Sequence, residues 1–287
     1  MVWRYIVLPV SVAAGIAGCA FKPPPQERIT TDTYQIVDDY SGTPAGRYNN
    51  RGAMRLEKGD VRGAVEDFQE AVKLDPKEPG YYENLGWTLS TLGDDAGALQ
   101  NLNAAIRLGP KDAEIYWKRG VINGRLGRYR DAREDFTTAL EMNPQLAKAY
   151  GDRGVAKAMK QDWQGAIADA TEAIKLDPAN AAAYRERGVA KLRMKDASGA
   201  IEDATTALRI SANDTAAYLL RAEAKMQAAD QVGAWDDLNA AIQLNPNLTR
   251  AYQMRAQVRR QLGDDRGARE DDEQAKKLKS KLRDDKP

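Results

Sequence analysis

The strongest constraint on this chain is a segment of 34 residues that recurs seven times in succession. The copies begin at Ala45, Pro79, Ala113, Ala147, Ala181, Thr215 and Thr249. Each copy carries Tyr at its fourth place, Gly or Ala at its eighth, and Ala at its twentieth and twenty-seventh. Small residues at fixed places let two helices approach closely, and the Tyr fills the space beside them. Because one such unit cannot bury its apolar face alone, its stability must come from stacking on its neighbours.

The middle of each copy carries the signals of a turn between two helices. Six copies place Asp at the sixteenth place, where a carboxylate accepts hydrogen bonds from the free amides of a second helix. These residues are Asp60, Asp94, Asp162, Asp196, Asp230 and Asp264. A glycine that ends the first helix stands before the turn in four copies, as Gly59, Gly93, Gly127 and Gly263. Pro at the thirty-second place of five copies is expected to break the second helix.

This arrangement resembles the tetratricopeptide repeat, whose pattern is an aromatic residue, Leu-Gly, Ala, an aromatic residue, Ala and Pro. The resemblance covers residues 45–282, about four-fifths of the chain. It implies an all-α fold, a right-handed α-solenoid of seven helix-turn-helix repeats, followed by a charged tail at 283–287. Asp272 stands where earlier copies have Phe68 or Leu102, as expected for the polar outer face of a terminal repeat.

One departure from the family pattern predicts ion pairs inside the repeats. Where Leu usually stands beside the Gly, six copies carry Arg, and the same six carry Asp in the predicted second helix. The predicted pairs are Arg51 with Asp67, Arg119 with Asp135, Arg153 with Asp169, Arg187 with Asp203, Arg221 with Asp237, and Arg255 with Asp271. The second copy lacks both, with Leu85 and Asn101 instead. This joint exception indicates a structural pair rather than a catalytic one; two separately solvated charges are the alternative.

The first residues have the character of an export signal. Arg4 supplies positive charge, and residues 5–17 are apolar, which is shorter than the roughly 20 residues that cross a bilayer core. The stretch ends in Ile16-Ala17-Gly18-Cys19, and Cys19 is the only cysteine. This ending resembles the lipobox of bacterial lipoproteins. The resemblance implies a signal peptide at 1–18 and a Cys19 that carries diacylglycerol and an amide-linked chain such as palmitate. An ordinary cleaved signal with an incidental Cys is the alternative.

The residues after Cys19 suggest where such an anchor would lie. In bacterial lipoproteins, an Asp directly after the lipidated Cys is an inner-membrane retention signal. This chain has Ala20 at that position. The resemblance therefore favours an outer-membrane lipid anchor facing the periplasm, with a cytoplasmic-membrane lipoprotein or a secreted protein as alternatives. Residues 19–44 are expected to form the lipidated N-terminus and an extended tether, because Pro23, Pro24 and Pro25 favour polyproline geometry.

The composition argues against catalysis and against binding to nucleic acid. The chain has 43 Lys+Arg against 42 Asp+Glu, so its net charge of +1 gives no strong attraction to a polyanion. It has no His, the side chain most used for proton transfer near neutral pH and the commonest metal ligand. A single Cys excludes intrachain disulfides and Cys-based zinc sites. We expect no enzymatic activity, no metal and no cofactor.

The resemblance also predicts where a partner binds, because first helices line a concave groove in this family. The second, fifth, ninth and twelfth places share one helical face. On or beside that face the sequence places nine candidate residues: Trp87, Trp117, Val121, Val155, Val189, Asn84, Lys118, Arg185 and Arg193. Exposed aromatic residues in a concavity are typical binding anchors. Packing of the two tryptophans against neighbouring first helices is an equally weighted alternative.

These features together predict a non-catalytic scaffold or adaptor, tethered to the bacterial envelope, that binds envelope proteins or peptides. Lipid-anchored tetratricopeptide proteins include adaptors that bring proteases to peptidoglycan hydrolases. Others are pilotins or assembly factors for outer-membrane and pilus proteins. One anchor, one tether and one helical array favour the adaptor over the alternative pilotin. The residues leave the partner and the oligomeric state open.

Overall fold

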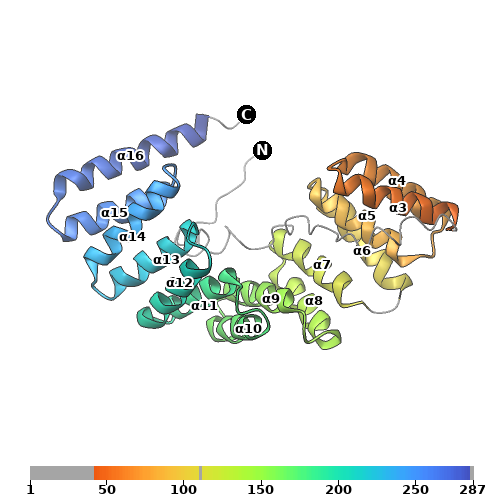
Figure 1. Ribbon diagram of the computed structural model, residues 1–287, viewed down its shortest axis with the longest axis horizontal. Helices are drawn as coiled ribbons and strands as arrows, with labels where there is room; N and C mark the ends of the chain where they lie inside the picture. The colour runs from red at the N-terminus through yellow and green to blue at the C-terminus, as the bar shows by residue number, and fades with distance from the viewer. Residues whose placement is uncertain (1–41, 110–111, 285–287) are drawn as a thin grey trace. The chain divides into compact units, whose positions relative to one another are not determined.

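The computed structural model describes residues 42–109 and 112–284, with side chains as far as residue 281. Across these ranges the regular elements are fourteen α-helices in seven consecutive pairs, which confirms the expected all-α repeat fold (Figure 1). The first helices are α3 (Pro44–Glu57), α5 (Pro79–Thr91), α7 (Ala113–Arg125), α9 (Ala147–Met159), α11 (Ala181–Arg193), α13 (Thr215–Gln227) and α15 (Thr249–Gln261). The second helices are α4 (Val61–Leu74), α6 (Asp95–Leu108), α8 (Tyr129–Met142), α10 (Trp163–Leu176), α12 (Ala197–Ile210), α14 (Gln231–Leu244) and α16 (Asp265–Asp284). The predicted signal peptide, Cys19 and the tether as far as residue 41 lie outside the described residues.

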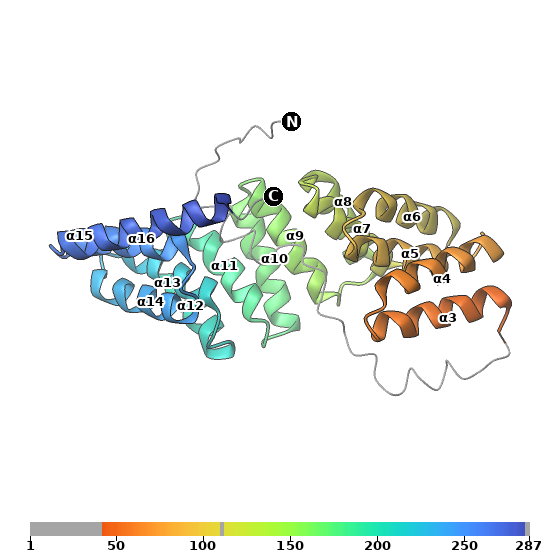
Figure 2. The ribbon, with the colours of Figure 1, turned by 90° about the horizontal axis from the view of Figure 1, so that it is seen from above.

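The described helices divide into two compact units, with the boundary between Ala156 and Lys157 inside α9. Within each unit, second helices such as α4, α6, α12 and α14 pack against the first helix of their own repeat and against the first helix of the next one. The two views show such partners side by side, for example α3 with α4 and α15 with α16 (Figures 1 and 2). The N-terminal unit (described residues 42–156) and the C-terminal unit (157–284) are treated separately below.

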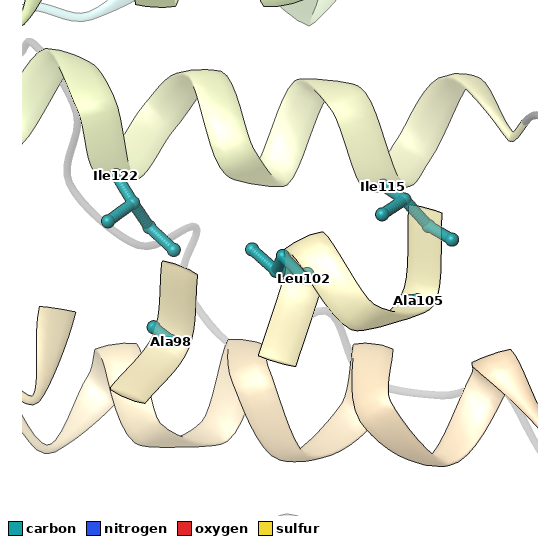
Figure 3. Packing of buried hydrophobic residues seen from close by; sticks show 5 residues of the cluster. All are labelled: Ala98, Leu102, Ala105, Ile115 and Ile122. Atoms are coloured by element: carbon teal, nitrogen blue, oxygen red, sulfur yellow. The ribbon is translucent and has the colours of Figure 1, made fainter. Parts of the chain in front are cut away.

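The core between successive repeats is built from the same places at two junctions, one in each unit. At the junction of α6 and α7, Ile115 and Ile122 point from α7 onto Leu102 and onto the space left by Ala98 and Ala105 (Figure 3). All five are at most 5% exposed. In the C-terminal unit the equivalent residues Ala251, Val258, Ala234 and Leu238 form the same kind of cluster. The third and tenth places of a first helix therefore pack onto the twenty-fourth place of the preceding second helix.

The prediction that Asp at the sixteenth place caps the second helix is confirmed. Each of the six predicted Asp residues accepts a hydrogen bond from the amide of the glycine three places later. A Cβ on that glycine would lie only 2.1–2.3 Å from the capping Oδ2, so the Asp and the Gly are required together. The third repeat has Arg128 and Asp131 at these places, and there the cap has no side-chain hydrogen bond.

The glycines before the turns take the left-handed conformation, with φ between 73° and 84° at Gly59, Gly93, Gly127 and Gly263. Three repeats adopt the same conformation without glycine: Gln161, Lys195 and Ala229 have φ of 61–66°. A side chain in this region clashes with its own following carbonyl, at a cost of roughly 1–2 kcal/mol per residue.

Replacing Ala229 with glycine is therefore expected to raise the free energy of unfolding of the protein. The relief of strain exceeds the extra chain entropy that glycine gives to the unfolded state, so the net gain should be about 0.5–1 kcal/mol. Urea unfolding followed by circular dichroism measures it. The matched control is Ala228→Gly, where φ is −83° and glycine should destabilise instead. A loss of stability in both variants would contradict the strain argument.

Proline has a smaller part in ending the second helices than expected. Asp75, Asn143, Asp177 and Asn245 precede Pro and leave the helix with φ between −143° and −134°, as steric contact with a following Pro favours. Ser211 takes the same geometry, φ −132° and ψ 89°, although Ala212 follows it. A following Pro is therefore not required for this geometry at the end of the helix. The last helix, α16, is longer than the others and includes residues 283 and 284, which were expected in the charged tail.

Candidate interaction surface

Five of the predicted Arg–Asp pairs are formed within single repeats. The shortest N···O distances are 2.5–2.7 Å, in Arg51–Asp67, Arg119–Asp135, Arg187–Asp203, Arg221–Asp237 and Arg255–Asp271. The Asp side chains are only 3–6% exposed. In the sixth set, Asp169 contacts Lys157 at 2.8 Å and Arg153 donates to Thr137 at 3.3 Å. Most of the five pairs are bidentate, the geometry in which Arg binds a carboxylate most strongly.

The sequence reasoning missed a further basic residue that contacts the buried Asp in five of the repeats. One helical turn after the Arg, a further basic residue contacts the same carboxylate at 2.8–3.3 Å. These residues are Arg55, Lys157, Lys191, Lys225 and Arg259. In the third repeat Asn123 takes this place and donates to Asp135 at 3.0 Å; burial raises the pKa of Asp135, against the opposing effect of Arg119. The signal was present in the sequence, because the eleventh place is basic wherever the Asp is present, except at Asn123.

Five arginines of the predicted pairs, all except Arg51, also reach the preceding repeat. The Nη1 of each donates to a hydroxyl or amide oxygen at the twenty-fifth place of that repeat, at 2.6–3.4 Å. The acceptors are Asn103, Thr137, Thr171, Thr205 and Asn239. In all six arginines the guanidinium carbon lies 4.9–5.6 Å from the ring centroid of the Tyr at the fourth place. One side chain thus contacts three helices, and the array is held by polar contacts as well as by its apolar core.

The first helices of the N-terminal unit carry a compact group of aromatic and charged residues, here called the tryptophan cluster: Trp87, Trp117, Lys118, Lys148 and Asp152. The two indole rings lie 5.6 Å apart between centroids and are tilted by 44°. Trp117 donates its Nε1–H to Oδ2 of Asp152 at 2.7 Å, and Nζ of Lys148 lies 3.9 Å from its ring centroid. Lys118 lies 5.8 Å from the ring of Trp87. Successive first helices α5, α7 and α9 contribute to this cluster, so it crosses repeat junctions.

The lysines of the tryptophan cluster are balanced by glutamates on the preceding first helix. Lys118 pairs with Glu83 at 2.5 Å, and Lys148 pairs with Glu114 at 2.8 Å. Burial raises the pKa of Asp152 to about 6, while the hydrogen bond from Trp117 and the charge of Lys148 oppose the rise. A carboxyl group with this pKa changes charge just below neutral pH.

The expected apolar stripe is largely closed to solvent. Trp117, Val121, Val155 and Val189 are only 2–8% exposed, because neighbouring helices cover them. The alternative interpretation, packing against neighbouring first helices, therefore describes Trp117. Trp87 keeps part of its surface open, so the surface offered by the tryptophan cluster is polar with one accessible aromatic ring.

The predicted polar border is also engaged within the chain. Asn84 donates to Asn49 at 2.8 Å. In the C-terminal unit, the buried Arg185 pairs with Asp214, and Arg193 pairs with Glu223 at 3.0 Å. The nine predicted partner-binding residues thus divide between the two units: Val189, Arg185 and Arg193 lie in the C-terminal unit and the other six in the N-terminal one. Their role in binding stays a prediction.

Two further searches of the described residues bear on function. Across residues 42–109 and 112–284, no group of three or more His, Cys, Asp or Glu side chains is arranged to hold a metal ion. None of the helices described is both long and apolar enough to span a bilayer.

The chain is similar to known repeat proteins in sequence and in structure. Models of the tetratricopeptide repeat match residues 45–78, 89–127, 118–181 and 153–215. No curated protein sequence matches the chain. Among solved structures, a tetratricopeptide repeat protein from Parabacteroides merdae ATCC 43184 aligns with a TM-score of 0.67 at 18% identity, over 83% of this chain and 94% of that one.

Two other structures show the same fold. The APC/C hetero-tetramer Cut9-Hcn1 aligns with a TM-score of 0.68 at 20% identity, over 79% of this chain but only 46% of the other. This chain therefore spans less than half of that protein. YrrB, described as a TPR protein with an unusual peptide-binding site, aligns with a TM-score of 0.54 at 19% identity, over 66% of this chain and 96% of that one. The periodic places, the paired helices and these matches together show that the chain belongs to the tetratricopeptide repeat family.

Proposed function

We propose that this protein is a non-catalytic scaffold that binds an extended segment of an envelope protein on the first helices of its N-terminal unit. Repeat proteins of this family are generally non-catalytic scaffolds for protein–protein interaction. The observation that carries the proposal is the tryptophan cluster, where the partly exposed ring of Trp87 lies beside Lys118 and Glu83. An accessible indole next to groups that can exchange hydrogen bonds suits an anchor for a peptide side chain and its backbone.

The similarity to YrrB adds a reason to look for a peptide, since that protein is described as having a peptide-binding site. The closed apolar stripe changes what the partner is expected to contribute. Because Val121 and Val155 are buried, a partner meets mainly polar and charged groups around a single aromatic ring. A segment with one apolar anchor residue flanked by polar residues fits this surface best. Adaptor proteins recruit their clients through such segments.

Photocrosslinking in living cells tests this proposal. A photoreactive amino acid at position 84, which is partly exposed beside Trp87, should give a discrete adduct with an envelope protein. Trp87→Ala should remove an anchor contributing about 2 kcal/mol or more, and so weaken the adduct by more than tenfold. The matched control places the photoreactive residue at Arg107, which is exposed on the second helix α6 of the same repeat. Adducts from position 107 together with none from position 84 would contradict binding on the first helices.

The membrane attachment is a separate part of the proposal and rests on the sequence of residues 1–19, with Cys19 as the acylated residue. Two or three acyl chains, each contributing roughly 0.8 kcal/mol per buried CH₂, would hold the chain on a membrane without a transmembrane helix. Cells fed labelled palmitate should incorporate the label into the native chain and not into Cys19→Ser, which should move to the soluble fraction. The outer membrane, facing the periplasm, is the proposed location, and density-gradient separation of the two membranes tests it. Equal labelling of both chains would contradict the anchor.

A further inference from the structure

Five of the six internal junctions share the polar contact of the seventh-place Arg, and together with the apolar contacts it shows how a first helix packs on the second helix of the preceding repeat. The third and tenth places pack onto the twenty-fourth place of the preceding repeat, as Ile115 and Ile122 do on Leu102 (Figure 3). The Arg at the seventh place donates to the twenty-fifth place of the preceding repeat, as Arg255 does to Asn239 at 2.6 Å. The two ends of the array can be compared with this pattern, independently of the proposed function.

The first helix α3 carries positive charge at the places that contact the preceding repeat in internal junctions. Arg47 occupies the third place, where other copies have residues such as Ile115 or Ala251, and it is exposed. Arg51 at the seventh place is paired with Asp67, but its side chain is 52% exposed. The equivalent arginines at internal junctions, such as Arg221 and Arg255, are only 15–20% exposed. The difference arises because an internal arginine is covered by the preceding second helix. In the described part of the chain, no helix precedes α3.

The last helix α16 carries negative charge at the places that contact the following repeat in internal junctions. Asp272 stands at the twenty-fourth place, which is Phe, Leu or Ala in the six other copies. Glu273 stands at the twenty-fifth place, where internal junctions offer Thr or Asn to the incoming arginine. Glu273 is exposed, and Asp272 is 37% exposed beside Arg260. Two places that are neutral at the internal junctions thus carry carboxylates at the α16 end. At the α3 end one such place carries Arg47, beside the arginine that the seventh place has in most copies.

We infer that copies of this chain associate head to tail, with α3 of one copy on α16 of the next, so that Arg51 reaches Glu273 and Arg47 reaches Asp272. The interface continues the stacking of the repeats and is heterologous, so it can add further copies. Charge complementarity selects the orientation. Lys276, at the twenty-eighth place, has the same sign as Arg47, and Arg260 already pairs with Asp272. The contact of Arg51 with Glu273 is therefore the main one, and the association is weak, with a dissociation constant in the micromolar range or above.

Sedimentation velocity of the full chain carrying Cys19→Ser tests this inference, because the substitution removes the acyl chains from the measurement. The average sedimentation coefficient should rise with protein concentration and fall as salt screens the contact. Glu273→Lys should weaken association by tenfold or more. Glu270→Lys is the matched control: it reverses the same charge one turn away on the exposed face of α16, and it should associate like the parent chain. Circular dichroism verifies that each variant is folded.

Mixing two variants tests the orientation. Arg51→Gln removes the main contact at the α3 end only, with Arg55 still paired to Asp67 at 3.2 Å, and Glu273→Lys removes it at the α16 end only. Each alone should remain monomeric, whereas an equimolar mixture should form dimers and nothing larger, since one intact end of each kind remains. Monomers of the parent chain at all concentrations would overturn the inference and would mean that the charges act as polar caps. Association that Glu273→Lys leaves unchanged, or a mixture that stays monomeric, would overturn it as well.

Discussion

Replacing Asp237 with alanine is expected to lower the free energy of unfolding by about 3–5 kcal/mol. The carboxylate is 4% exposed and contacts two cations, Arg221 at 2.6 Å and Lys225 at 2.9 Å. Its hydrogen bond raises the pKa of Arg221, and the variant leaves both basic side chains without this shared carboxylate. Without the Asp they face each other one helical turn apart, with about one-fifth of each side chain in water to recover hydration. That partial exposure places the expected loss at the lower end of the range.

Urea unfolding of the variant against the parent chain measures this loss. The second repeat supplies the matched control, because Asn101 stands at the same place without a cation and donates to Gly97 at 2.8 Å. Asn101→Ala should therefore cost only about 1 kcal/mol, the usual contribution of one neutral hydrogen bond. A loss below 1 kcal/mol for Asp237→Ala would mean that the pair is solvated and contributes little. The second repeat has replaced this network with the apolar residues Leu85 and Leu89, which pack in its core.

The sequence alone was sufficient to predict the repeat frame, because the period of the small residues determines both helices of each pair. The caps followed as well, since Asp and Gly at fixed spacing have one structural explanation at a helix start. The repeat frame did not show which residues of neighbouring repeats come into contact. Arg255 was paired correctly with Asp271, but its second contact, Asn239, lies in the preceding repeat. The distance between Arg255 and Asn239 depends on how the two repeats stack.

The candidate site shows the same limit more clearly. The frame placed Trp117 on the face that carries partner-binding residues in this family. It did not show that Asp152, one place further along in the next repeat, accepts a hydrogen bond from the indole and closes over it. The place of a residue within the repeat predicts only the face of its own helix on which the side chain lies. Burial depends on the side chain that the next repeat contributes, and that residue differs from one repeat to the next.

Replacing Asp152 with asparagine is expected to stabilise the protein at neutral pH. Burial raises the pKa of this carboxyl to about 6, so the folded protein favours the neutral form. Asparagine keeps an acceptor for Nε1–H of Trp117, now 2.7 Å from Oδ2, and carries no charge to desolvate. A rise of about two pKa units corresponds to at most about 3 kcal/mol. Since Asp152 keeps part of its surface in water and Lys148 loses a favourable charge, we expect a gain of about 1–2 kcal/mol at pH 7.5.

The sign of the pH dependence follows from the direction of the shift. Between the pKa of the unfolded chain, near 3.8, and that of the folded protein, about 6, the folded state binds more protons than the unfolded state. The contribution of Asp152 to stability is therefore greatest below pH 4 and is lost as the pH rises through 6. The advantage of Asp152→Asn should be full above pH 7 and should shrink to near zero by about pH 4.

Thermal or urea unfolding of both chains from pH 4 to pH 8 measures this convergence directly. Glu141→Gln provides the matched control, since it neutralises an exposed carboxylate on α8 of the same unit and should change stability by less than about 0.5 kcal/mol. Parallel stability curves for Asp152→Asn and the parent chain would refute the argument, because a gain independent of pH cannot come from titration of this carboxyl. A variant less stable at pH 7.5 than at pH 5, relative to the parent, would show that the ionised Asp152 holds Trp117 and Lys148 together. The tryptophan cluster would then require the negative charge of Asp152 for its stability.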